Sequence, residues 1–158
     1  MFKKALISSA ALALLLTLPG SSRANSDGFG LGFIAGEPTG VSGKLWMGRT
    51  TALDMAVAWS SAGDDDDLHL QADHVWHDFG LLSVDEGRLP VYYGIGARVR
   101  FDDGPGDDGV GIRFPVGLAY LFQGNKVDIF GEVVPTLEVT PDSDFDVEGG
   151  IGLRYFFH

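Results

Sequence analysis

Ten charged side chains that alternate with apolar or small residues are the part of this sequence best suited to chemistry. Acids and bases at this spacing form ion pairs, or they line a path for ions through a protein. We predict that they form a charge network in the interior of the protein: Arg98, Arg100, Arg113, Glu132, Glu138, Asp146, Glu148, Lys44, Asp54 and Asp73.

If sequence segments that are joined by a turn pair as neighbouring strands, their pairing predicts which of these charges lie side by side. One level should hold Arg100, Gly111, Glu138 and Asp146, and the next Arg98, Arg113, Thr136 and Glu148. Further along, Lys44 should face Asp54, with Asp73 beside it. Neighbouring like charges need counter-charges, because an unpaired buried charge costs several kcal/mol. The glutamates can neutralise the arginines, and Lys44 the two aspartates. Two interpretations stay open, a salt-bridged plug and a gated or ion-selective pore.

A second group of acids is concentrated in short stretches rich in turn residues, at 64–67, 102–108 and 142–144. Carboxylates bind hard divalent cations such as Mg²⁺ and Ca²⁺, although the spacing of a helix–loop–helix calcium site is absent. These acids either bridge through divalent cations to anionic lipid and lipopolysaccharide headgroups, or are solvated charges that keep the chain soluble in transit. We assign no metal ligands among them.

The histidines do not form a catalytic set. His69, His74 and His77 have no serine two positions away, as a barrel deacylase would require. His69, Asp73 and His77 share one face, but along a strand they span about 26 Å, too far for one metal. We therefore expect no enzymatic activity and no cofactor.

The elements that position these charges are β-strands, because apolar and polar residues alternate with a period of two. In residues 145–157, Ile151, Leu153 and Tyr155 fall on one face, and Glu148 and Arg154 on the other. The pattern predicts eight strands and an all-β, antiparallel, up-and-down transmembrane barrel. Their expected ranges are 28–35, 39–48, 51–60, 67–78, 89–102, 109–122, 126–139 and 145–157.

The apolar face should point outward to lipid and the polar face into the lumen. A lumen enclosed by eight strands is only just filled by side chains, so the bulky apolar face cannot fit inside. The other face is rich in glycine, and aromatic residues gather near strand ends, as in interfacial girdles. A periplasmic, lipocalin-like ligand-binding barrel is the alternative from another class.

The connections predict the orientation of the barrel. Three of the four joining strands 1–2, 3–4, 5–6 and 7–8 are strongly acidic, whereas those at 48–50 and 123–125 carry no acid. An even strand number places both termini on the periplasmic side, so the acidic loops face outward. The connection at 79–88 is apolar before its turn, and we expect strand 67–78 to continue there as a protruding hairpin.

The first residues are typical of an export signal. Lys3 and Lys4 precede an apolar run, and Ser22-Arg23-Ala24 forms a cleavage site, which predicts a signal peptide at 1–24 and a barrel domain at 25–158. The net charge of −11 argues against binding nucleic acid. The absence of cysteine excludes disulfides and a lipid-modified N-terminus.

The last strand, ending Leu153-Arg154-Tyr155-Phe156-Phe157, resembles those of small outer-membrane barrels of the OmpA transmembrane-domain and OmpX type. The segments 36–44 and 92–98 also resemble a widespread family of small, uncharacterised bacterial barrels. The resemblance implies a monomer in the cell outer membrane, inserted by the barrel assembly machinery, which reads a terminal aromatic. Here His158 follows that aromatic, a departure from the pattern. The expected role is structural or interactive, with a narrow pore for ions or small solutes as the alternative.

Overall fold

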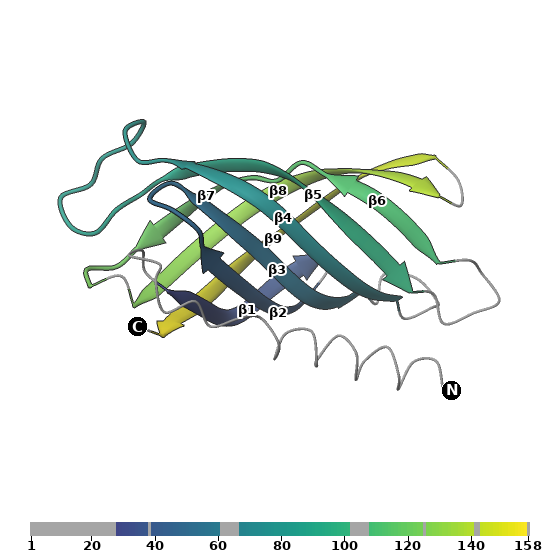
Figure 1. Cartoon of the computed structure of the whole chain (residues 1–158), viewed down its shortest axis with the longest axis horizontal. Coiled ribbons are helices and arrows are strands. Elements are labelled where there is room, and N and C mark those ends of the chain that lie inside the picture. The colour runs from purple at the N-terminus through teal and green to yellow at the C-terminus, as the bar shows by residue number, and fades with distance from the viewer. Residues whose placement is uncertain are drawn as a thin grey trace.

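The computed structural model describes residues 28–37, 39–60, 67–101, 108–124, 126–140 and 143–157, and within them the chain forms one antiparallel sheet (Figure 1). The signal peptide predicted at 1–24 lies outside the described residues. The strands are β1 (Phe29–Glu37), β2 (Thr39–Trp46), β3 (Thr51–Ser60), β4 (Asp67–Asp78), β5 (Val91–Phe101), β6 (Gly109–Arg113), β7 (Val116–Leu121), β8 (Val127–Thr140) and β9 (Asp144–Phe157).

The sheet closes into a barrel. Each strand pairs with the next along the chain, except that β6 and β7 do not pair with each other, and β9 pairs with β1 from Phe29↔Phe157 to Glu37↔Gly149. Strands β6 and β7 occupy one position in the wall, since both pair with β5 on one side and β8 on the other. The wall is therefore an eight-strand ring, and the predicted fold class is confirmed.

The break between β6 and β7 falls at Phe114 and Pro115, inside the predicted strand 109–122. Proline has no N–H to donate to a ladder, so a regular strand is interrupted there. The gap is still bridged, because Gly94 N donates to Pro115 O at 3.0 Å and Phe114 N donates to Pro135 O at 2.9 Å. The alternation of faces continues across it, with Phe114 and Val116 both exposed.

The side chains alternate between the outer surface and the lumen as the sequence predicts. On β9, Ile151 is 68% exposed and Leu153 50%, whereas Arg154 is 1% and Phe156 2% exposed. We call the end with the connections at 61–66 and 102–107 the loop end. The opposite end, which carries the turn at 47–50 and residues 28 and 157, is the turn end, on the left in Figure 1.

The expected hairpin extension of strand 67–78 is wrong. Strand β4 ends at Asp78, whose Oδ1 accepts hydrogen bonds from Gly80 N at 2.8 Å and Leu81 N at 3.1 Å, which turns the chain. The connection returns along β7, where Arg88 and Leu121 exchange backbone hydrogen bonds of 2.9 and 2.8 Å. Phe79, in this connection, packs against buried side chains of the lumen.

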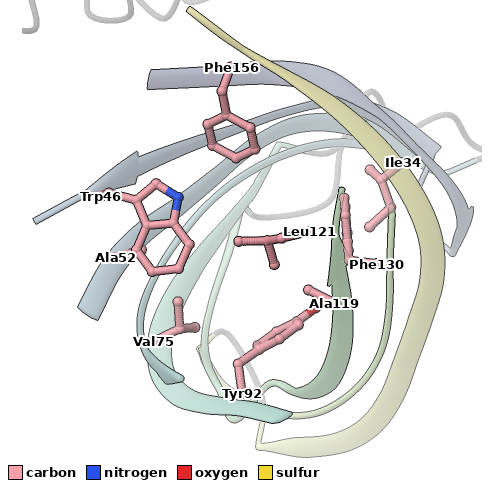
Figure 2. Close-up of a cluster of buried hydrophobic side chains, with 9 residues drawn as sticks. All are labelled: Ile34, Trp46, Ala52, Val75, Tyr92, Ala119, Leu121, Phe130 and Phe156. Carbon is pink, nitrogen blue, oxygen red and sulfur yellow. The ribbon is translucent and has the colours of Figure 1, made fainter. Parts of the chain in front are cut away.

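An apolar layer fills part of the lumen (Figure 2). Several of its members come from the turn end of their strands, notably Trp46, Leu121 and Phe156. The layer is built from Ile34, Trp46, Ala52, Val75, Tyr92, Ala119, Leu121, Phe130 and Phe156. These side chains come from strands all around the ring, so they pack together across the lumen.

Inward glycines make room for the large rings of this layer. A Cβ on Gly117 would lie 2.6 Å from the Tyr92 ring, and one on Gly30 would lie 2.5 Å from the Phe156 ring. A strand glycine that lets another group approach closely is a recurrent device in barrels. The glycines of the inner face are therefore a packing requirement of these large rings.

Gly117→Ala should lower the free energy of unfolding by about 1–3 kcal/mol, because the new methyl group must displace Tyr92. Gly131→Ala is the matched control, since its Cβ would meet nothing nearer than Gly150 O at 3.9 Å. Urea unfolding of both variants in lipid vesicles measures the difference. Equal stability of the two variants would contradict the packing argument.

Candidate functional site

The loop-end half of the lumen holds a cluster of arginines and glutamates. Arg100 Nη2 lies 2.6 Å from Glu138 Oε1, and Arg98 Nη2 lies 3.7 Å from Glu138 Oε2. Arg98 also pairs directly with Glu148 through Nη1. The Arg98 side chain is 4% exposed and that of Glu148 6%, so the charges neutralise each other away from bulk solvent.

Arg113 joins this cluster to the middle of the barrel. Its Nε donates to Asp73 Oδ1 at 3.0 Å, and its Nη1 donates to Glu148 Oε2 at 2.9 Å and Gln71 Oε1 at 2.7 Å. Glu132 Oε1 lies 3.9 Å from Nη2. With 1% exposure, Arg113 is among the largest fully buried side chains, and its charge is compensated from three strands.

A second cluster lies toward the turn end. Arg154 makes a two-pronged contact with Asp128, from Nε and Nη2, both at 3.0 Å. Asp54 Oδ1 lies between the two cations of this cluster, 3.6 Å from Arg154 Nη1 and 3.3 Å from Lys44 Nζ. Bidentate arginine–carboxylate pairs are the strongest and most orientation-specific of such contacts.

Aromatic rings complete the surroundings of the two cations of this second cluster, Arg154 and Lys44. The Arg154 guanidinium lies 3.9 Å from the centre of the Phe130 ring. Lys44 Nζ lies 4.8 Å from the Trp46 ring centre and 5.2 Å from that of Tyr92. A cation over a ring face is attracted by the ring quadrupole, most strongly where water is excluded. The second cluster thus merges with the apolar layer.

The structure brings together most, but not all, of the charges singled out from the sequence. Lys44 lies opposite Asp54, and Asp54 opposite Asp73, in the registers of β2, β3 and β4. The Asp73 carboxylate, however, binds Arg113 rather than Lys44. Asp146 is exposed at the loop end and forms no ion pair with any described residue; its Oδ1 accepts from Val147 N.

The two predicted levels of charges are wrong at two strand pairs, β5–β6 and β8–β9. In each pair the register differs from the predicted one by two residues. Arg100 lies opposite Gly109 rather than Gly111, and Arg98 lies opposite Gly111. Asp146 lies opposite Thr136 rather than Glu138. A slip of two leaves every side chain on its own face, so the alternation that predicted the strands could not reveal it.

Sequence reasoning left out several partners that the lumen uses. Arg154 and Asp128 stand at inward positions of predicted strands, so parity alone could have added this pair. Gln71 and Tyr92 carry no charge at neutral pH, yet Gln71 binds Arg113, and Tyr92 Oη donates to Glu132 Oε2 at 2.7 Å. No charge pattern would have identified them.

The histidines divide between the two faces. His69 and His77 are buried and face inward, whereas His74 packs edge-on against Trp76, with ring centres 4.5 Å apart, on the outer surface. Within the described ranges, no group of three or more histidine, aspartate or glutamate side chains is arranged to hold a metal ion. Most of the predicted acidic connections lie outside those ranges. No helix of the described chain is long and apolar enough to cross a membrane.

Comparison with known proteins supports the fold. No family model matches the chain, and no curated protein matches it in sequence. Among solved structures, the chain is similar to the N-terminal β-barrel domain of Pseudomonas aeruginosa OprF. The TM-score is 0.57 at 13% sequence identity, over 82% of this chain and 95% of that domain. The chain therefore has the fold of a small, OmpA-like β-barrel.

Arg113→Ala should destabilise the barrel by about 3–5 kcal/mol, because it leaves buried carboxylates without their counter-charge. The double variant Arg113→Ala with Asp73→Ala should cost less than the sum of the two single variants. Arg49→Ala is the control, at an exposed position of the turn at 47–50, and should cost under about 1 kcal/mol. Urea unfolding in vesicles gives all four values. Costs below about 1 kcal/mol for Arg113→Ala would mean that its charge is already solvated by a water-filled lumen.

Proposed function

We propose that the protein is an integral outer-membrane β-barrel whose lumen is closed, with a structural or interaction role in that membrane. The observation that carries the proposal is the content of the lumen. Two ion-pair clusters and an apolar layer fill it, and the largest buried side chains are the bases Arg113, Arg154 and Lys44 together with Tyr92. Such a barrel anchors in or organises the membrane rather than conducting or catalysing.

The outer surface supports a lipid environment. Phe33 is 71% exposed, Val133 56% and Val147 55%, and comparable side chains surround the ring. Soluble monomers rarely expose so large a continuous apolar area. Trp59 and Phe145 are exposed toward the loop end, and Trp76, Tyr155 and Phe157 toward the turn end. This spacing fits two interfacial aromatic girdles.

The closed ring also supports a monomer. Strands β1 and β9 satisfy each other's backbone hydrogen bonds, so the described strands leave no open sheet edge to recruit a second chain. We propose that the acidic connections face the outside, where lipopolysaccharide and divalent cations are the expected partners. Insertion would use the barrel assembly machinery, through the aromatic end of β9.

The closed lumen is tested by conductance in planar bilayers. The unmodified barrel should show no steady conductance at neutral pH, because its charges are paired and buried. Steady, ion-selective conductance would replace the proposal by the narrow pore. Heat-modifiable gel migration of protein from outer-membrane fractions tests the location. Recovery of the protein from the soluble periplasmic fraction would favour the ligand-binding barrel.

Leu118→Arg should cost about 2–4 kcal/mol of folding free energy in vesicles, because the guanidinium would lie near the bilayer midplane. Leu118 is 45% exposed on β7. Thr50→Arg, in the exposed turn at 47–50, is the matched control and should be nearly neutral. Equal effects of the two variants in folding titrations into lipid would contradict the membrane-spanning assignment.

A further inference from the structure

The hydrogen bond between Lys44 and His77 has a property that the ion pairs of the lumen lack. Lys44 Nζ lies 2.7 Å from His77 Nε2, and both side chains are buried. The other ring nitrogen, Nδ1, lies 3.1 Å from Thr50 O, a carbonyl that can only accept. Nδ1 therefore carries the ring hydrogen, and Nε2 accepts from the Lys44 ammonium. The contact requires a neutral imidazole.

A second proton on His77 would place two cations in direct contact. Asp54, from β3, is the nearest acid, and it already lies 3.3 Å from Lys44 and 3.6 Å from Arg154. Asp128, from β8, is held by Arg154. From the other sides His77 meets Tyr92 of β5 and the connection at 79–90, where Arg88 covers the Phe79 ring. No further carboxylate among the described residues faces the ring to compensate a new charge.

His77 is also part of the apolar closure at the turn end. Its ring centre lies 4.5 Å from that of Trp46, 5.4 Å from Tyr92 and 6.2 Å from Phe79. Trp46 and Tyr92 in turn enclose the Lys44 ammonium. Separating Lys44 from His77 therefore requires these rings to move, which couples the protonation of one imidazole to the packing of the closure.

We propose that the Lys44–His77 contact makes the turn-end closure of the lumen sensitive to acid. Unperturbed histidine gains its charge near pH 6.5, within the range that an outer membrane meets. Below about pH 6.5 the closed barrel has to exclude a proton from His77. The closed arrangement then becomes less stable relative to an opened one that admits the proton. Acid thereby loosens the layer around Trp46, Tyr92 and Phe79. The inference rests on the closed lumen of the proposed function.

A single cysteine provides the test, because the chain has none of its own. Val75 is fully buried in the apolar layer, two residues from His77 on β4. Val75→Cys is labelled with a methanethiosulfonate reagent in vesicles, with and without His77→Gln. Glutamine can accept from Lys44 but does not take up a proton. Comparing the two proteins at one pH cancels the ionisation of the thiol itself.

At about pH 7.5 both proteins should label slowly and at the same rate. At about pH 5 the protein that keeps His77 should label about tenfold faster than the His77→Gln protein. His74→Gln, on the outer surface of the same strand, is the control and should label like the protein that keeps both histidines. A rate ratio that is the same at the two pH values would overturn the proposal.

Two further measurements keep the outcomes distinct. Fast labelling of both proteins at neutral pH, or steady conductance there, would contradict the closed lumen itself rather than its acid sensitivity. If His77→Gln does not fold, nitrogen NMR of histidine in the unmodified barrel replaces it. His77 should keep the Nδ1–H neutral form below about pH 6.5, where an unperturbed histidine is charged. A His77 ring that takes up its second proton at about pH 6.5 would overturn the proposal.

Discussion

The ladder between β1 and β9 is the constraint on which the rest of the structure depends. It joins the two ends of the described chain over Phe29 to Glu37 and turns a sheet with two open edges into a ring. Closure satisfies the backbone hydrogen bonds without water, which is the condition for placing strands in lipid. It also defines an inside, so that every second side chain has to fit a narrow lumen. The charges, the glycines and the apolar layer are consequences of that restricted space.

The contents of the lumen follow from the size of the ring. Eight strands leave a space just filled by side chains, so each large inward group needs a small one on a neighbouring strand. Tyr92 over Gly117 and Phe156 over Gly30 show this complementarity for the rings. Buried carboxylates from several strands provide it electrostatically for Arg113 and Arg154. Large side chains thus lie beside small ones, and buried cations lie beside carboxylates, around the whole ring.

Much of this architecture could be predicted from the sequence. The alternation of apolar and polar residues along each strand shows on which face of the sheet each residue lies. Ile151 and Arg154 fall on the faces that the alternation assigns, and the position of Lys44 opposite Asp54 follows from the short turn between β2 and β3. The long connections carry no such information. They hide the register of Arg100 against Gly109. They also gave no sign that the Asp78 side chain would end β4 by accepting hydrogen bonds from the backbone amides of Gly80 and Leu81. Partners without charge, such as Gln71, also left no signal in the pattern.

Alternation of faces does not detect a register shift of two residues, and this gives the buried charges a second role. Moving β9 by two residues along β8 would keep every side chain on its own face of the wall, so the separation of the two faces does not distinguish the two registers. It would, however, separate Arg154 from Asp128 and move Glu148 relative to Thr136 and Val134. A buried pair adds little net stability over an apolar pair of similar volume, but breaking one is costly. The ion pairs of the lumen therefore penalise the alternatives that alternation permits, so the charge network of the lumen also selects the register of the barrel.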